Sequence, residues 1–151
     1  MTTRILFLCT GNSARSILAE VIANHRFGDA LQAWSAGSQP KGTPHPLALE
    51  TLDRHGLPTD AARSESWDMY RDAPFDLVVT LCDSAAAETC PVFPGAPIQV
   101  HWGLPDPPAA DDPAAMFEQV FRTLVGALER FTTMEADLDV RAAAVADLVS
   151  T

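Results

Sequence analysis

The stretch Leu8-Cys9-Thr10-Gly11-Asn12-Ser13-Ala14-Arg15-Ser16 lies between a short apolar run and a helical pattern, and the rest of the chain can be arranged around it. The run from Ile5 to Leu8 predicts a buried strand, and the residues from Ser13 to about Phe27 predict a helix. A loop between such a strand and helix gathers backbone N–H groups at the positive end of the helix dipole. The stretch therefore predicts a binding site for an anion.

Two side chains in this loop carry reactive chemistry. Cys9 supplies a nucleophilic sulfur, and the planar guanidinium of Arg15 matches a tetrahedral oxyanion in two places. The field that attracts an anion should also favour the thiolate of Cys9, to which the Ser16 hydroxyl could donate a hydrogen bond. We expect Gly11 to supply unusual backbone angles. The alternative is a buried cysteine that ends a strand, with a surface arginine nearby. The predicted oxyanion-binding residues are Thr10, Gly11, Asn12, Ser13, Ala14, Arg15 and Ser16.

Length and charge restrict the class of protein. The 151 residues suffice for one compact domain, and the formal net charge of −10 argues against nucleic acid or an anionic membrane as a partner. Residues 1–4 lead directly into the first strand, and no apolar run is long enough to span a bilayer. We therefore expect a cytoplasmic protein without a signal peptide. An anionic ligand would have to overcome the negative field, and Arg15 with the loop amides is the only obvious means.

The chain has three cysteines, Cys9, Cys82 and Cys90. An odd count without a secretory signal argues against a structural disulfide framework and favours reactive thiols in a reducing compartment. Cys82, Cys90 and His101 could in principle hold a metal, but their spacing matches no common zinc pattern. We expect neither a metal nor an organic cofactor.

Strand and helix patterns alternate along the chain. Further strands are predicted at 31–34, 75–81 and 97–101, and a second helix at 47–55. Asp111-Asp112-Pro113 opens a long helix that continues to Phe131, because an acidic cap followed by proline is a strong start signal. Alternation of this kind implies an α/β fold, with a four-stranded parallel sheet between helices on both faces.

The last residues differ from the rest. We place one domain at 1–134 and a C-terminal extension at 135–151, which is rich in alanine and has a weak apolar stripe. The extension could be a helix packed on the body, a helix packed on a second subunit, or a frayed tail.

Cys82 lies at the end of a predicted strand, as Cys9 does. Carboxyl ends of parallel strands meet at the ligand-binding edge of a sheet, so these two thiols could be close in space. Cys90 follows eight positions after Cys82, within reach of a flexible loop. Three thiols at one edge suggest a relay in which one thiol after another attacks the preceding sulfur. The alternative is that Cys82 and Cys90 are small buried hydrophobic residues.

Asp106 lies in a loop that three prolines stiffen, after the last predicted strand. A carboxylic acid held over an anion site can protonate a leaving oxygen. The alternative is a capping or turn aspartate, which is common beside proline.

The motif Cys-Thr-Gly-Asn-Ser-x-Arg-Ser, followed by Ala19-Glu20, resembles the low-molecular-weight protein tyrosine phosphatases and the arsenate reductases that share their fold. It is most similar to the thioredoxin-coupled arsenate reductases, and the resemblance runs from about Arg4 to Phe131. It implies a flavodoxin-like three-layer sandwich. Many arsenate reductases have another cysteine at Ala14, and the interval from Cys82 to Cys90 looks one residue longer than in the best-known members.

The resemblance also implies roles for individual residues. Asp106 corresponds to the general acid, and Cys9, Cys82 and Cys90 correspond to the redox triad. Asn12 corresponds to a residue that stabilises the loop, and Ser35 could meet it from the second strand. Some relatives bind potassium near this pair.

The expected function is reduction of arsenate to arsenite. Cys9 attacks the bound arsenate, Asp106 assists the loss of an oxygen, and Cys82 releases arsenite by attacking Cys9. Cys90 then forms a disulfide with Cys82 that thioredoxin reduces, although mycothiol or glutaredoxin could replace it. One alternative is a phosphatase that hydrolyses phosphotyrosine or small phosphate esters through a phosphocysteine. Pro108 and Ala109 weaken it, because such phosphatases usually have aromatic residues there. A further alternative is a non-catalytic oxyanion or redox sensor.

Overall fold

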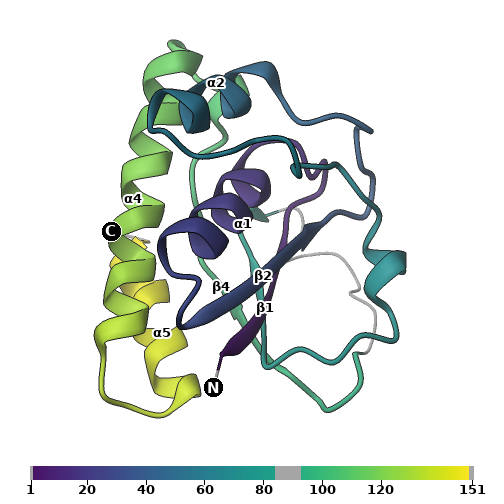
Figure 1. Cartoon of the computed structure of the whole chain (residues 1–151), viewed down its shortest axis with the longest axis vertical. Coiled ribbons are helices and arrows are strands. Elements are labelled where there is room, and N and C mark those ends of the chain that lie inside the picture. Colours follow the sequence, from purple (N-terminus) through teal and green to yellow (C-terminus); the bar gives the residue numbers. More distant parts are fainter. Residues whose placement is uncertain (1, 84–92, 150–151) are drawn as a thin grey trace.

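The computed structural model describes residues 2–83 and 93–149. Its centre is a four-stranded sheet, with helices beside it in Figure 1. The strands are β1 (Thr3–Leu8), β2 (Leu31–Ala36), β3 (Leu77–Thr80) and β4 (Ile98–His101). They are all parallel and lie in the order β2-β1-β3-β4. Leu8 pairs with Ala36 on one side and with Thr80 on the other, so the carboxyl ends of three strands reach the same edge. The predicted parallel α/β sheet is confirmed.

Helices and short 3-10 turns follow the strands. The elements are α1 (Arg15–Arg26), α2 (Pro46–Arg54), η1 (Trp67–Tyr70), η2 (Pro107–Ala109), α4 (Pro113–Thr133) and α5 (Leu138–Val149). The long helix begins as predicted: Pro113 is its first residue, and the Asp112 side chain accepts a hydrogen bond from the Ala115 amide at 3.2 Å.

The central strand is buried on both faces. Ile5 and Phe7 belong to the larger core, which also includes residues of α1 and α4. Leu6 and Leu8 belong to a smaller core with Phe75 on the opposite face. A strand buried on both sides has a continuous apolar sequence, which explains why β1 shows no alternation of polar and apolar residues.

The C-terminal segment forms α5, which packs against α4 and β4. Ala142 and Val145 are buried, and the indole Nε1 of fully buried Trp102 donates a hydrogen bond to the Ala142 carbonyl at 3.0 Å. Arg141 lies over the ring of Phe131, with its guanidinium carbon 4.6 Å from the ring centroid. The extension therefore contacts the residue that begins the loop leading to Asp106.

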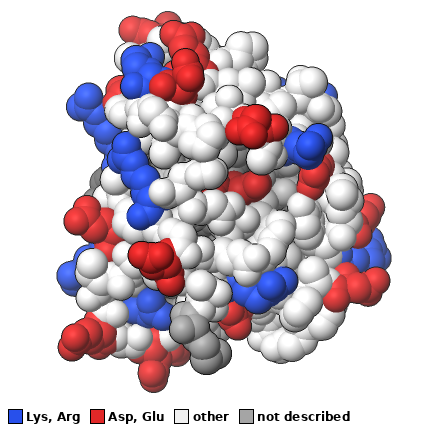
Figure 2. All heavy atoms as spheres, in the orientation of Figure 1, with Lys and Arg blue, Asp and Glu red and all other residues white. Residues whose placement is uncertain are grey.

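Within the described ranges, no helix is both long and apolar enough to cross a membrane. Acidic and basic side chains are interspersed over the face of the molecule in Figure 2.

Glu118 joins α2 to α4. Its carboxylate lies 2.8 Å from Arg54 Nη2, 2.8 Å from His55 Nε2 and 2.8 Å from Arg122 Nε. Hydrogen bonds from Arg54, His55 and Arg122 lower the pKa of Glu118 to about 2. Since the ionised form is favoured in the folded state, this cluster stabilises the packing of the two helices at neutral pH.

The Glu118→Gln substitution is expected to lower the free energy of unfolding at pH 7 by about 1 kcal/mol, after allowance for solvent screening. The folded pKa lies below the ordinary value of 4.5, so the contribution is present above pH 4.5 and is lost as the pH falls towards 2. The difference between the variant and the wild type should therefore shrink in that window. Urea unfolding at several pH values measures it, and exposed Glu129→Gln on the same helix is the control. An equal loss in both variants would contradict the assigned role of Glu118.

Candidate active site

The segment after β2, residues 39–45, forms hydrogen bonds with the outer side of the loop that contains Cys9. Three backbone donors of this segment bind three loop carbonyls: Gln39 to Thr10 at 3.0 Å, Lys41 to Gly11 at 3.0 Å, and His45 to Ser13 at 2.8 Å. The Ser64 hydroxyl also donates to the Gly11 carbonyl, at 3.2 Å. These loop carbonyl oxygens point outward to the segment after β2. They therefore do not face an anion bound inside the loop.

The start of α1 offers donors to such an anion. The helix begins at Arg15, and Ala14 at its N-cap supplies no side-chain cap. Within residues 2–83 and 93–149, the amide groups from Ser13 to Ser16 have no recorded acceptor. Unpaired amides at a helix N-terminus form an anion-binding site.

The expectation that Gly11 supplies the unusual backbone angles is wrong. Asn12 takes the left-handed conformation, with φ of 42°, and Gly11 does not. Asn12 tolerates this because its buried side chain is held at both ends: Nδ2 donates to Ser16 Oγ at 2.8 Å, and Oδ1 accepts from the Glu65 amide at 2.7 Å. The sequence suggests a hydrogen bond from the Ser16 hydroxyl to the sulfur of Cys9. In the structure, Ser16 Oγ instead accepts a hydrogen bond from Asn12.

Cys9 and Cys82 lie against each other, as predicted from the strand ends. Both are buried, with 6% and 5% of their surface exposed, and they form a contact cluster of their own. The Thr10 amide donates to the Cys82 sulfur at 3.4 Å, and the Thr10 hydroxyl lies 3.6 Å from it. The second cysteine is therefore held by the loop of the first.

The groups of the loop favour the Cys9 thiolate, as predicted, but the net shift of the Cys9 pKa in this structure is upward. The hydrogen bond with Cys82 and burial raise the pKa of Cys9, whereas Arg15 and the Gly11 amide lower it, and the raising causes prevail. A thiol that donates its hydrogen to a neighbouring sulfur loses that hydrogen bond on ionising, so its pKa is raised. Close approach of Cys82 therefore opposes the effect of Arg15 on the same sulfur.

Arg15 links the loop of residues 9–16, called the anion loop below, to Asp106, the predicted general acid. Its Nη1 donates to the Leu104 carbonyl at 2.9 Å, and its Nη2 lies 3.5 Å from the Asp106 carboxylate. The Arg15 Nε is buried and has no partner among the described residues. Asp106 occupies the N-cap position of η2 but makes no capping hydrogen bond with its side chain. The carboxylate thus faces Arg15, and the alternative role as a helix cap is not observed.

Comparison with known proteins agrees with this arrangement. Residues 4–142 match the family model of the low molecular weight phosphotyrosine protein phosphatases. The chain belongs to this family. It is 37% identical over 129 residues to arsenate reductase 2 of Staphylococcus epidermidis, covering 85% of this chain and 95% of that protein.

Solved structures of the family have the same fold. The thioredoxin-dependent arsenate reductase of Corynebacterium glutamicum superposes with a TM-score of 0.65 at 27% identity, over 85% of this chain and 61% of that one. The low molecular weight protein tyrosine phosphatase of T. tengcongensis superposes with a TM-score of 0.66 at 24% identity, over 83% of this chain and 94% of that one. The four-stranded sheet and helices are thus those of the low-molecular-weight phosphatase fold, a flavodoxin-like sandwich.

In this member of the family, Asn12 and Ser35 have separate recorded partners. The Ser35 hydroxyl donates to Glu20, whereas Asn12 accepts from the Glu65 amide. Burial raises the pKa of Glu20 to about 7, and the nearby Glu65 contributes to the rise. The Tyr70 hydroxyl donates to the Glu65 carboxylate at 2.6 Å. Ser35 and Glu20, and Tyr70 and Glu65, are thus two hydrogen-bonded pairs whose carboxylates affect each other electrostatically.

The third cysteine of the predicted relay, Cys90, lies outside the described residues. His101, considered above as a metal ligand, bonds through Nδ1 to Thr80 Oγ1 at 2.9 Å and through Nε2 to Asp83 at 3.0 Å. No group of three or more potential metal ligands occurs among the described residues.

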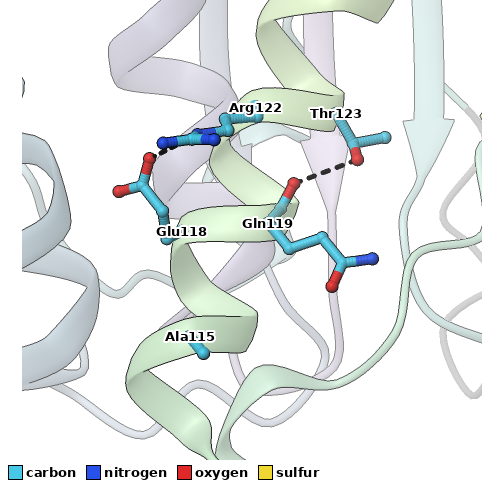
Figure 3. Close-up of a pocket in the computed structure, with 5 residues that line it drawn as sticks. All are labelled: Ala115, Glu118, Gln119, Arg122 and Thr123. Carbon is cyan, nitrogen blue, oxygen red and sulfur yellow. Dashed lines mark hydrogen bonds and ion pairs between the residues drawn. The ribbon is translucent and has the colours of Figure 1, made fainter.

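A hollow lies on the exposed side of α4, and no residue of the Cys9 loop lines it (Figure 3). Its lining residues all belong to α4: Ala115, Glu118, Gln119, Arg122 and Thr123. Arg122 pairs with Glu118, and the Thr123 hydroxyl donates to the Gln119 carbonyl. The Arg122 and Thr123 side chains are thus bonded within α4 and the hollow contains no cysteine, so it is not the candidate active site.

Sequence reasoning missed two residues of the site. The backbone oxygens of Cys9 and Thr10 lie 2.4 Å from the position that a Cβ on Gly37 would take. Lys41 packs on Gly11, with its Cε 3.2 Å from the corresponding Cβ position. Lys41 is the only lysine in the chain, which is the one signal in the sequence that could have directed attention to it.

Proposed function

We propose that this protein reduces arsenate to arsenite with Cys9 as the nucleophile and Cys82 as the second thiol. The observation that supports it best is the contact of Cys82 with Cys9 above the anion loop. A phosphatase that releases its phosphocysteine with water has no need of a second thiol there. The arsenate reductase names of the relatives support the same assignment.

The first step forms a bond between Cys9 and arsenic. The thiolate attacks arsenate, and a hydroxyl leaves as water with a proton from Asp106. Arg15 and the amides from Ser13 to Ser16 stabilise the charge on the remaining oxygens. The raised pKa of Cys9 means that its proton has to leave on or before attack, and the basic oxyanion is one acceptor.

The second step transfers electrons. The Cys82 thiolate attacks the sulfur of Cys9, and the pair of electrons in the sulfur–arsenic bond passes to arsenic. Arsenic is thereby reduced, arsenite leaves, and a Cys9–Cys82 disulfide remains. Cys90 then attacks Cys82, which frees Cys9 as a thiolate and gives a Cys82–Cys90 disulfide. A dithiol protein such as thioredoxin reduces that disulfide, and no bound organic cofactor is needed.

The test is arsenate-dependent oxidation of NADPH in the presence of thioredoxin and thioredoxin reductase. Turnover is expected in the wild type and is expected to fall to background in Cys82→Ser and Cys90→Ser. Hydrolysis of para-nitrophenyl phosphate, which needs only Cys9, Arg15 and Asp106, should persist in both variants. Rapid phosphate ester hydrolysis without arsenate-dependent oxidation would replace this function by that of a phosphatase. Replacing thioredoxin with glutaredoxin or mycothiol tests the identity of the reductant.

We also propose that potassium binds behind the loop, near Asn12 and Ser35. Glu20 and Ser35 would hold it with oxygen donors, and its charge would favour the ionised form of Glu20. The pKa of Glu20 is about 7 in the folded state and ordinarily 4.5, so burial of this group costs stability as the pH rises between these values.

In tetramethylammonium chloride, the free energy of unfolding is expected to fall by about 2 kcal/mol between pH 4.5 and pH 7.5 through Glu20. Potassium chloride should reduce this loss, and Glu20→Gln should remove both the loss and the effect of potassium. Thermal unfolding in the two salts across this pH range measures it. The same melting temperature in both salts at pH 7.5 would rule out the potassium site.

A further inference from the structure

We propose that Lys41 supplies a second positive charge beside the loop of Cys9 and so strengthens the binding of an oxyanion there. The inference rests on the proposed function, because it concerns how an oxyanion reaches Cys9. The chain carries a formal net charge of −10, which opposes the approach of a multiply charged anion. Arg15 is the one cation inside the loop that the sequence indicates, and it is already engaged with Leu104 and Asp106.

The backbone fixes Lys41 at the loop. Its amide donates to the Gly11 carbonyl at 3.0 Å, and the next residue, Gly42, donates through its amide to the Ser64 hydroxyl at 3.2 Å. Ser64 in turn donates to the same Gly11 carbonyl. These contacts attach the segment of Lys41 to the outer side of the loop.

The side chain also lies on the loop. Its Cγ, Cδ and Cε are 3.4, 3.6 and 3.2 Å from the point where Gly11 would carry a Cβ. The ammonium is one bond beyond Cε, so its charge stays beside the loop.

No carboxylate among the described residues forms an ion pair with Lys41. By contrast, Arg54, Arg71 and Arg122 each pair with an acidic residue. The charge of Lys41 is therefore not neutralised locally and is available to an anion. An exposed ammonium acts over a distance that depends on ionic strength, so we expect it to affect binding and not the chemical step.

The experiment measures binding of inorganic phosphate, without arsenate or any reductant. Bound phosphate is expected to protect Cys9 from iodoacetamide, and mass spectrometry of the Cys9 peptide quantifies the protection. In Lys41→Gln the phosphate concentration for half protection should rise about threefold to tenfold at about 10 mM ionic strength. At about 0.5 M salt the change should be less than about twofold. Lys41→Arg should restore the wild-type value.

Arg130→Gln is the control, because it removes one exposed positive charge near the far end of α4. An equal loss of affinity in this variant would overturn the proposal, since net charge alone would then explain it. So would an unchanged phosphate affinity in Lys41→Gln at low salt. A changed iodoacetamide rate without phosphate would also overturn it, because Lys41 would then act on the ionisation of Cys9. Each of these results is independent of whether the wild type reduces arsenate.

Discussion

Replacing Arg15 with lysine is expected to lower kcat/KM for arsenate and for para-nitrophenyl phosphate by about 100-fold to 1,000-fold. The guanidinium reaches the Leu104 carbonyl with one nitrogen and the Asp106 carboxylate with another. Lysine keeps the charge, but its single ammonium cannot span these partners and bind an oxyanion in two places. Steady-state kinetics with both substrates measure the effect.

Arg26→Lys is the matched control, because Arg26 lies at the other end of the same helix. It should alter kcat/KM by less than about twofold, as is usual for a surface change away from the chemistry. Activity of Arg15→Lys close to that of the wild type would show that charge alone suffices at this position. The role assigned to the guanidinium fork would then be wrong.

Gly37→Ala is expected to destabilise the protein by about 2 kcal/mol or more and to lower activity by at least about 100-fold. A Cβ at Gly37 would lie 2.4 Å from the carbonyl oxygens of both Cys9 and Thr10, and backbone cannot move aside as a flexible side chain can. Gly37 is also bonded to the 65–67 segment, through its amide to Glu65 and its carbonyl to Trp67. The loop would have to shift at Cys9, the proposed nucleophile.

Gly126→Ala offers a control with the same chemical change. Nothing lies within 4 Å of a Cβ at Gly126, which is in the middle of α4. Alanine there should raise the free energy of unfolding by about 0.5 to 1 kcal/mol and leave activity intact. Thermal unfolding and phosphate ester hydrolysis compare the two variants. Full activity in Gly37→Ala would mean that the loop tolerates a shift at Cys9.

Much of the fold could be predicted from local patterns. The apolar run before Cys9 predicts β1, and Asp112 with Pro113 predicts the start of α4 at the correct residue. These signals depend on neighbours in the sequence, so they can be detected without tertiary contacts. The loop between β1 and α1 could be predicted for the same reason, with Cys9 and Arg15 at its two ends.

No local pattern shows that Cys82 and Asp106 lie near the loop. Their positions could be inferred only from the topology of the predicted sheet. Once the sheet is parallel, the carboxyl ends of β1 and β3 share an edge, and Cys82 follows β3. The prediction therefore succeeded for the position of Cys82. It did not anticipate that Cys82 raises the pKa of Cys9, because this effect depends on a contact between two buried sulfurs that spacing cannot measure.

By itself, the sequence indicated the order of the strands and main helices, the family, and Cys9 as the candidate nucleophile, since each is carried by residues adjacent in the chain. Only the tertiary structure decided which segments enclose the loop. Gly37 and Lys41 follow β2 and contact the loop after β1 because these strands pair side by side. Asn12, not Gly11, takes the left-handed conformation because Glu65 and Ser16 hold its side chain. Such contacts join residues distant in the chain, and they depend on distances that only the folded backbone sets.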